Sequence, residues 1–331
     1  MKTCFLHLGF HKTATTSFQN TCGANRQILE NHGIIIPDFC TESGQLSFNH
    51  TFPIHNIYER PAKQATYHQN NLRAWKKLLN SKQNILISGE GILKMPMRSL
   101  KNLLKDINNS GFQIKPFACV RTPYSFINSA LQNTIKNGAF HSIVRLGTAS
   151  STDFNLNMGT IPKIPSSLAL VKKGQKLFGD SMIFCPFSRA TNHKGGPVAF
   201  LLHDGLGIPV DDIEMTIANQ SLCNTTARLI NCLNSNDQLK EPFNLRRVKQ
   251  IIDKFVFSDK FLLTQSEFEF IQPAFESLQI NISDSLGPSY IDEKICFSKP
   301  LTADEINETL DQCPQQLRES IRHTKQYQSM R

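Results

Sequence analysis

Short apolar runs alternate with longer amphipathic stretches along this chain. The apolar runs have the length and composition of buried strands, and several end directly before a glycine or a proline. They cover residues 3–8, 34–36, 84–88, 114–120 and 181–184. Apolar residues recur at helical spacing over 15–29, 72–79, 101–107 and 196–203, and over most of the C-terminal third of the chain. Strands that alternate with helices are typical of an α/β fold with a mainly parallel, doubly wound sheet.

One further helix is bounded by signals at both ends. Thr122 is expected to be its N-cap, Pro123 its first residue and Gly138 its C-terminal stop. Residues 141–167 show no period and are rich in Ser, Thr, Asn, Gly and Pro, so we expect a long loop that acts as a substrate lid. The sequence contains no evident repeat or linker. We therefore expect a single domain over residues 1–331, with a core over about 1–235 and a helical C-terminal extension over about 236–331.

Composition narrows the class of protein. Lys and Arg number 36 against 27 Asp and Glu, and the resulting net charge of +9 favours an anionic partner. The apolar runs are shorter than the roughly 20 residues that cross a bilayer, and residues 3–8 are too short for a secretory signal. The nine cysteines contain no Cys-x-x-Cys pair, and Cys4, Cys119 and Cys185 lie in apolar runs. We expect reduced, buried cysteines in a cytoplasmic protein without a membrane span.

The strongest candidate for chemistry is a P-loop-like strand–loop–helix at the N-terminus. An apolar strand ends at Gly9, and the loop behind it carries Lys12 and opens a helix. Four of the five residues after the lysine carry a hydroxyl group: Thr13, Thr15, Thr16 and Ser17. Exposed N–H groups and the positive end of a helix dipole bind anions, and the lysine adds a full charge. The loop is not a Walker A element, because no glycine directly precedes Lys12.

A second cationic position lies further along the chain. Arg121 ends the apolar strand 114–120, and Ser129 lies on the helix that follows. The planar guanidinium fork suits a terminal phosphate, which it can hold with two parallel hydrogen bonds. Ligands of open α/β sheets bind at the carboxyl ends of the strands, so the Lys12 loop and Arg121 are expected on one edge.

These two motifs resemble the 5′-phosphosulfate loop and the 3′-phosphate motif of sulfotransferases that use 3′-phosphoadenosine-5′-phosphosulfate (PAPS), in particular bacterial carbohydrate-type enzymes. Residues 185–189, 195–196 and 218–222 resemble further segments of that family. Ala14 stands where the family usually has glycine, which costs about 1 kcal/mol if the backbone there needs a positive φ. The resemblance implies that the donor PAPS is bound by His11, Lys12, Thr13, Ala14, Thr15, Thr16, Ser17, Arg121 and Ser129.

Sulfuryl transfer resembles phosphoryl transfer, with in-line geometry and charge that grows on the leaving oxygen. Lys12 can stabilise that charge, so no metal is required. The family resemblance implies that the acceptor is a hydroxyl or amine of a carbohydrate, glycolipid or small metabolite. A base must take the proton of that acceptor. Glu90 is our first choice, because it follows the strand 84–88 and is expected on the same edge as Lys12. His50 and His55 are the alternatives, since histidine exchanges protons near neutral pH.

Three other functions stay open at this point. A P-loop kinase would need a glycine before the lysine and an acidic strand end that holds Mg²⁺, and neither is evident in the sequence. A nucleic-acid-binding module would show clustered Lys and Arg with interleaved aromatics, whereas the basic residues here are scattered, so we expect no nucleic-acid partner. Ala14 leaves room for a non-catalytic member of the fold that binds a nucleotide or polyanion. The sequence predicts neither the identity of the acceptor nor the oligomeric state.

Overall fold

The computed structural model describes residues 1–59, 66–147, 164–218, 221–235 and 259–328. Two compact units share the chain. The first consists of Met1–Thr122, Ser167–Asn219 and Ser283–Tyr290, and the second of Pro123–Ser166, Gln220–Ile282 and Ile291–Arg331. Segments of the two units alternate along the sequence, and this division does not follow the expected boundary near residue 235.

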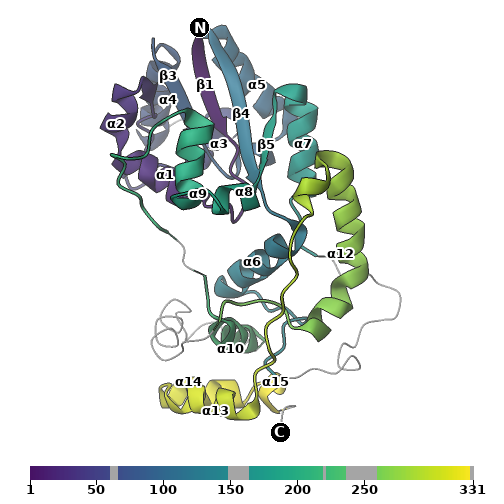
Figure 1. The fold of residues 1–331 in the computed structure, drawn as a ribbon. Coiled ribbons are helices and arrows are strands. Elements are labelled where there is room, and N and C mark those ends of the chain that lie inside the picture. The colour runs from purple at the N-terminus through teal and green to yellow at the C-terminus, as the bar shows by residue number, and fades with distance from the viewer. Residues whose placement is uncertain (60–65, 148–163, 219–220, 236–258, 329–331) are drawn as a thin grey trace. The chain divides into compact units, whose positions relative to one another are not determined.

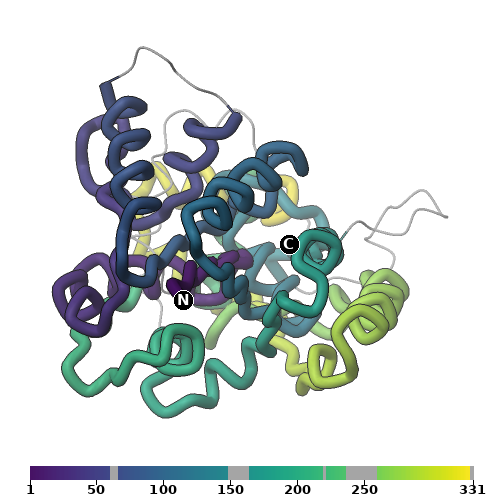
Figure 2. Tube along the Cα trace, turned by 90° about the horizontal axis from the view of Figure 1, so that it is seen from above, coloured from purple at the N-terminus to yellow at the C-terminus, as the bar shows by residue number. Residues whose placement is uncertain are grey.

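The first unit contains a five-stranded parallel sheet (Figure 1). Its strands are β1 (Lys2–His7), β2 (Ile34–Ile35), β3 (Asn84–Ser88), β4 (Phe112–Val120) and β5 (Ile183–Pro186), in the order β2-β3-β1-β4-β5. The central strand β1 pairs with β3 on one side and with β4 on the other, so that Cys4 is in register with Ile85 and Ile114. In the view from above, the chain begins at the near end of β1, and helices of this unit lie on either side of that strand (Figure 2). The prediction of an α/β fold with parallel strands is confirmed.

Helices and short helical turns connect the strands of the first unit. They are α1 (Thr15–Ala24), α2 (Arg26–Asn31), α3 (Thr51–Tyr58), α4 (Thr66–Leu79), η1 (Ile92–Lys94), α5 (Met97–Asn109), α7 (Leu168–Phe178), η3 (Gly179–Ser181), α8 (Phe187–Thr191), α9 (Gly196–Phe200), η4 (Leu201–Gly205) and η6 (Pro288–Tyr290). The helix expected over 15–29 is interrupted at Asn25. The Asn25 side chain donates to the carbonyl of Glu214 at 2.9 Å and accepts from its N–H at 3.1 Å, which fixes the break. The helix expected over 196–203 continues as a π-helix, η4.

A buried histidine joins the two strands that carry the site. His7 is fully buried, and its Nδ1 lies 2.8 Å from the hydroxyl of Ser88 at the end of β3. Gln19 of α1 donates to the same hydroxyl at 3.1 Å. Burial lowers the pKa of His7 to about 3, so its ring is neutral and can stack on Phe117 with 5.0 Å between the ring centroids. These contacts fix β1, β3 and α1 to one another beneath the loop that follows β1.

The second unit is helical in the described residues, as expected for the C-terminal part. Its helices are α6 (Pro123–Lys136), α10 (Asn224–Asn234), α12 (Gln265–Leu286), α13 (Ala303–Asp311), α14 (Gln315–Arg322) and α15 (Lys325–Gln328). The last four residues of α12 already belong to the first unit. Apolar residues of these helices, among them Ile127, Leu229 and Ile306, form one buried cluster. In the described part of the chain, no helix has both the length and the hydropathy that crossing a membrane requires.

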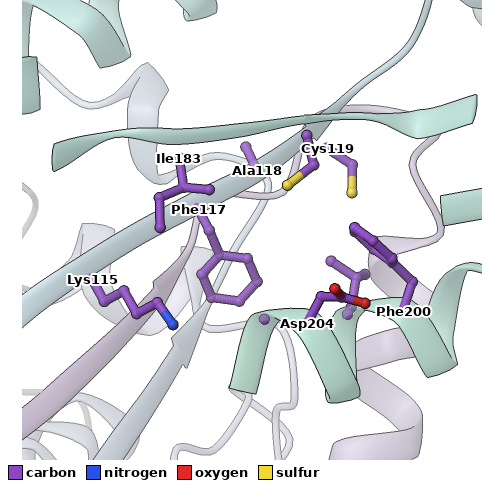
Figure 3. Close-up of a pocket in the computed structure, with 10 residues that line it drawn as sticks. Lys115, Phe117, Ala118, Cys119, Ile183, Phe200 and Asp204 are labelled. Carbon is purple, nitrogen blue, oxygen red and sulfur yellow. The ribbon is translucent and has the colours of Figure 1, made fainter. Parts of the chain in front are cut away.

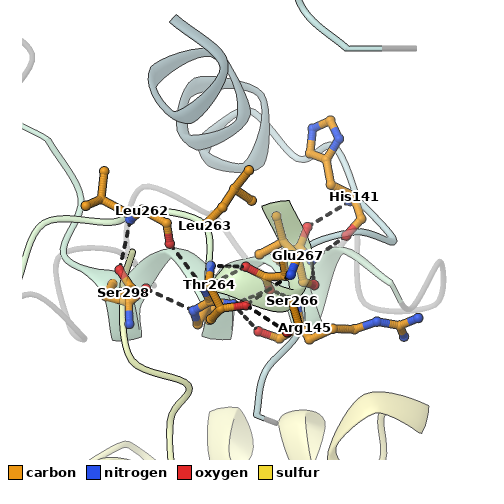
Figure 4. A network of polar contacts seen from close by, with 12 residues as sticks. His141, Arg145, Leu262, Leu263, Thr264, Ser266, Glu267 and Ser298 are labelled. Atoms are coloured by element: carbon orange, nitrogen blue, oxygen red, sulfur yellow. Dashed lines mark hydrogen bonds and ion pairs between the residues drawn. The ribbon is translucent and has the colours of Figure 1, made fainter. Parts of the chain in front are cut away.

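A buried ion pair lies inside this helical unit (Figure 4). Arg228 of α10 and Glu267 of α12 meet in two parallel contacts of 2.6 and 3.0 Å, and their side chains are 0% and 1% exposed. The guanidinium also donates to the Asn224 side chain and to the carbonyls of Arg145 and Leu262. The carboxylate accepts from the backbone N–H groups of Arg145 and Thr264. All five N–H groups of Arg228 are thus satisfied, as a buried charge requires.

Candidate donor-binding site

Charged side chains follow three neighbouring strands at their carboxyl ends. Lys12 comes five residues after the end of β1, Glu90 two residues after β3 and Arg121 directly after β4. Because β3 and β4 are the two neighbours of β1, the segments behind these strands leave the same edge of the sheet. This edge is where open parallel sheets bind their ligands.

The loop between β1 and α1 is closed by its own hydroxyl groups. The hydroxyl of Thr13 donates to the carbonyl of Phe10 at 2.7 Å, and that of Thr15 lies 3.4 Å from the same oxygen. A Cβ atom on Gly9 would come within 2.4 Å of the Thr15 side chain, so only glycine fits at this position. The two threonines are buried. Their hydroxyls therefore shape the loop, whereas the sequence had favoured them as donors to a ligand.

The first turn of α1 carries the remaining hydroxyls. The Ser17 hydroxyl accepts from the backbone N–H of Ala218 at 3.0 Å and donates toward its carbonyl at 3.4 Å. It thereby fixes the segment around residue 218 to α1. Thr16 is half-buried on the same turn. Of the four hydroxyls predicted to face the donor, that of Thr16 has no hydrogen-bond partner among the described residues.

Ala14, which stands where the resembling family usually has glycine, adopts the left-handed backbone conformation. Its φ is 60°, directly before the first residue of α1, and Lys12 has a φ of 65°. A side chain costs about 1 kcal/mol in this region, whereas glycine enters it freely. The methyl group of Ala14 packs against the apolar cluster of the first unit, which offsets part of the cost.

We expect Ala14→Gly to stabilise the protein by up to about 1 kcal/mol, because the substitution removes the penalty of a positive φ. Ala74→Gly is the matched control, since Ala74 lies inside α4 and a glycine there is expected to destabilise by about 0.5–1 kcal/mol. Urea unfolding of the two variants beside the parent chain measures both values. Destabilisation by both substitutions would contradict the strained geometry at residue 14.

Glu90 lies in a chain of polar contacts with two basic residues. Its Oε2 is 3.2 Å from Nδ1 of His11, and Nε2 of that histidine is 2.6 Å from the ammonium of Lys94. An ammonium can only donate, so Nε2 accepts and the proton of a neutral His11 ring sits on Nδ1, facing Glu90. Sequence reasoning missed Lys94. The signal available was its position four residues after Glu90, on the turn η1 that β3 leads into.

His50 has a structural position, in contrast to its predicted role as an alternative base. It is 1% exposed, its ring Nδ1 accepts the backbone N–H of Ser88 at 3.1 Å, and its backbone N–H donates to the carbonyl of Ser88 at 2.9 Å. Burial, followed by the charge of Arg26, lowers the pKa of His50 to about 3. The buried, neutral ring holds the end of β3. His55 likewise contacts this segment, with its Nε2 3.1 Å from the carbonyl of Gly91.

Arg121 lies against an aromatic ring at the start of α8. Its guanidinium carbon is 4.5 Å from the ring centroid of Phe187, a cation–π distance. Burial lowers the pKa of Arg121 to about 10, so the side chain stays charged at neutral pH although it has lost part of its hydration. A partly desolvated guanidinium gains more from a phosphate partner than one in bulk water.

The helix after Arg121 begins at Pro123, as predicted, and an acidic side chain distant in the sequence contacts its first turn. The carboxylate of Glu293 accepts the backbone N–H groups of Tyr124 and Ser125 at 2.6 and 2.9 Å, and so caps the start of α6. Thr122, the expected N-cap, directly precedes the first residue of this helix. Ser129 is half-buried on α6 and belongs to the second unit, whereas Arg121 belongs to the first.

The expected lid and one of the segments that resemble bacterial sulfotransferases are described only in part. Residues 148–163 of the expected lid, and residues 219–220 of the segment that resembles bacterial sulfotransferases, lie outside the described residues. Arg189, from the other resembling segment, is 68% exposed and pairs with Asp204 at 3.4 Å. Comparison with known proteins gives no match for this chain, whether with family models, curated proteins or solved structures.

Proposed function

We propose that this protein is a sulfotransferase that moves the sulfuryl group of PAPS to a hydroxyl or amine of a carbohydrate, glycolipid or small metabolite. The observation that carries this proposal is the placement of Lys12, Glu90 and Arg121 behind β1, β3 and β4, three neighbouring parallel strands. Two cations suit the two anionic ends of the donor, and a carboxylate on the same edge of the sheet suits a proton acceptor.

The order of the strands in the sheet bears on where a ligand would bind. The chain adds β2 and β3 on one side of β1 and then crosses to add β4 and β5 on the other. This order supports a doubly wound sheet with a P-loop-like strand–loop–helix in which the ligand binds where the direction of winding changes. The N–H groups at the start of α1 and the charge of Lys12 would then hold the phosphosulfate.

In the proposed reaction Glu90 takes the proton of the acceptor as the acceptor oxygen or nitrogen bonds to sulfur. The bond between sulfur and the bridging oxygen breaks, and 3′-phosphoadenosine-5′-phosphate leaves. Lys12 stabilises the negative charge that grows on the bridging oxygen. His11 contacts Oε2 of Glu90, which leaves Oε1 to face the acceptor. Arg121 holds the 3′-phosphate at the other end of the nucleotide.

A nucleotide kinase is the rival function that one observation favours. Glu90 follows a strand next to β1, and an acidic group in such a place can hold Mg²⁺ in P-loop enzymes. Against this, Glu90 contacts His11 at 3.2 Å, and Lys94 lies beyond that ring at 2.6 Å, so its surroundings are already basic. A non-catalytic protein that binds a nucleotide would share the same loop and differ only in turnover.

Donor binding tests the proposal. We expect 3′-phosphoadenosine-5′-phosphate at 100 times its dissociation constant to stabilise the protein by about 2.7 kcal/mol, measured by thermal unfolding. Arg121→Ala is expected to weaken this binding by about 2–4 kcal/mol, because a charged bidentate contact is lost. Arg73→Ala is the control, since Arg73 is an exposed residue of α4 whose guanidinium donates to the side chain of Asn70 on the same helix. Greater stabilisation by Mg-ATP than by the 3′-phosphorylated nucleotide would favour the kinase.

A further inference from the structure

Two histidines and an aspartate meet in the first unit outside the donor loop. His193 lies in the turn after α8, and His203 and Asp204 lie side by side in η4. Nε2 of His193 is 3.9 Å from Oδ2 of Asp204, and Nδ1 of His203 is 3.6 Å from the same oxygen. One ligand atom from each residue lies within 4.8 Å of the other two.

We propose that this cluster, which we call the His₂Asp cluster, binds a divalent transition-metal ion, with Zn²⁺ as the best fit. Two imidazole nitrogens and one carboxylate oxygen form a common zinc ligand set, and zinc bonds to them at about 2.0–2.2 Å. Ligand atoms around a tetrahedral ion of that size lie about 3.3–3.5 Å apart. The two histidine–aspartate distances therefore need to shorten by only a few tenths of an ångström. A water molecule takes the fourth position.

The carboxylate of Asp204 is already oriented for such an ion. Its Oδ1 faces the guanidinium of Arg189 at 3.4 Å, whereas its Oδ2 faces both histidines. Metal-binding carboxylates are usually held in this way, with one oxygen on a neighbouring donor and the other on the ion. Nδ1 of His193 is buried and has no hydrogen-bond partner among the described residues, so the polar neighbours of this ring lie on its Nε2 side.

The backbone supports the same conclusion independently. His203 and Asp204 lie in a π-helix, a rare form that is often found at functional sites. The turn is pressed against the sheet, because a Cβ atom on Gly205 would come within 2.9 Å of Phe117. A small cavity of about 30 Å³ lies behind Asp204 and is lined by apolar side chains such as Phe117, Cys119 and Phe200 (Figure 3). The apolar wall supports the turn on the side of the sheet, while His203 and Asp204 are exposed to solvent.

The proposed ion would join the turn after α8 to η4. Metal binding at the His₂Asp cluster does not depend on the sulfotransferase proposal. None of the three ligands belongs to the loop after β1 or to the residues at the ends of β3 and β4. The reaction proposed above needs no metal, and the His₂Asp cluster adds none to it.

Zinc binding to the untagged full chain tests this inference. After treatment with a chelator, one equivalent of Zn²⁺ is expected to bind in isothermal titration calorimetry and to raise the melting temperature. Co²⁺ as a probe should give the visible absorption of a four-coordinate ion. His203→Ala and Asp204→Asn are each expected to weaken zinc binding by more than about 100-fold.

His32→Ala is the matched control, because His32 is an exposed histidine at the end of α2 and lies outside the cluster. This variant should bind zinc like the parent chain. Circular dichroism confirms that each variant is folded, and 61% exposure of the His203 side chain makes its replacement tolerable. Zinc binding that persists unchanged in both His203→Ala and Asp204→Asn, or the absence of any zinc binding by the parent chain, overturns the proposal.

Discussion

Glu90→Gln is expected to lower the rate of sulfuryl transfer by about 10²–10⁴-fold, with the affinity for the donor nucleotide unchanged. The amide is nearly isosteric with the carboxylate and can still contact His11, but it cannot take a proton from the acceptor. Transfer of labelled sulfate from PAPS, with acceptor fractions as a substrate panel, measures the rate.

Two control variants sharpen this test. Glu30→Gln changes an exposed carboxylate on α2 and is expected to leave the rate as it is. His50→Gln is expected to reduce stability more than turnover, because His50 is buried and holds the end of β3. An active Glu90→Gln enzyme beside a folded but inactive His50→Gln enzyme would assign the base to histidine. Loss of nucleotide binding in Glu90→Gln would instead make Glu90 a residue of the donor site.

Arg228→Met is expected to destabilise the protein by about 3–5 kcal/mol, because it leaves the carboxylate of Glu267 buried without its counter-ion. Glu267 is 1% exposed, and two backbone N–H groups are the donors that would remain to it. Urea unfolding followed by circular dichroism measures the loss. The double replacement Arg228→Met with Glu267→Met removes both charges and is expected to recover much of the stability.

An exposed pair in the same helical unit provides the comparison. Arg318 lies 3.4 Å from Asp311 with side chains 31% and 61% exposed, so Arg318→Met should cost no more than about 1 kcal/mol. Equal losses for Arg228→Met and Arg318→Met would show that burial does not govern the value of these ion pairs. A double replacement as unstable as Arg228→Met alone would mean that packing, and not the unpaired charge, accounts for the loss.

The sequence predicted the sheet well because buried strands have a simple signature. The five apolar runs all form strands, and the run 84–88 has the same bounds as β3. Helices were predicted less completely. The start of α6 at Pro123 was identified, but α3, α7, α8 and α10 were missed. Of these, α3 and α8 are short, and every described residue of α10 is buried, which leaves that helix without a polar face. The break at Asn25 depends on Glu214, a partner distant in sequence that no local pattern reveals.

The same limit applies to the candidate site. A lysine in a loop after a buried strand and an arginine at a strand end were visible as local patterns. The engagement of Ser17 by Ala218 and the cap that Glu293 gives α6 were not, because each joins residues more than 150 positions apart. The left-handed φ of Ala14 was anticipated only through the family resemblance. His193, His203 and Asp204 meet because η4 folds back beside the turn after α8, so their spacing in the sequence gave no ligand motif.

The division of α12 between the two units sets an order of events during translation. The first unit is complete only when residues 283–290 are present: the carbonyl of Ser285 accepts from Gln175, and the Tyr290 hydroxyl donates to the carbonyl of Phe184 in β5. The ribosome must therefore extend the chain from residue 219 to residue 290 before the edge strand β5 gains its contact with Tyr290. At about 5–20 residues per second the nascent sheet waits roughly 4–14 s with β5 incompletely protected, a period in which chaperones have access to it.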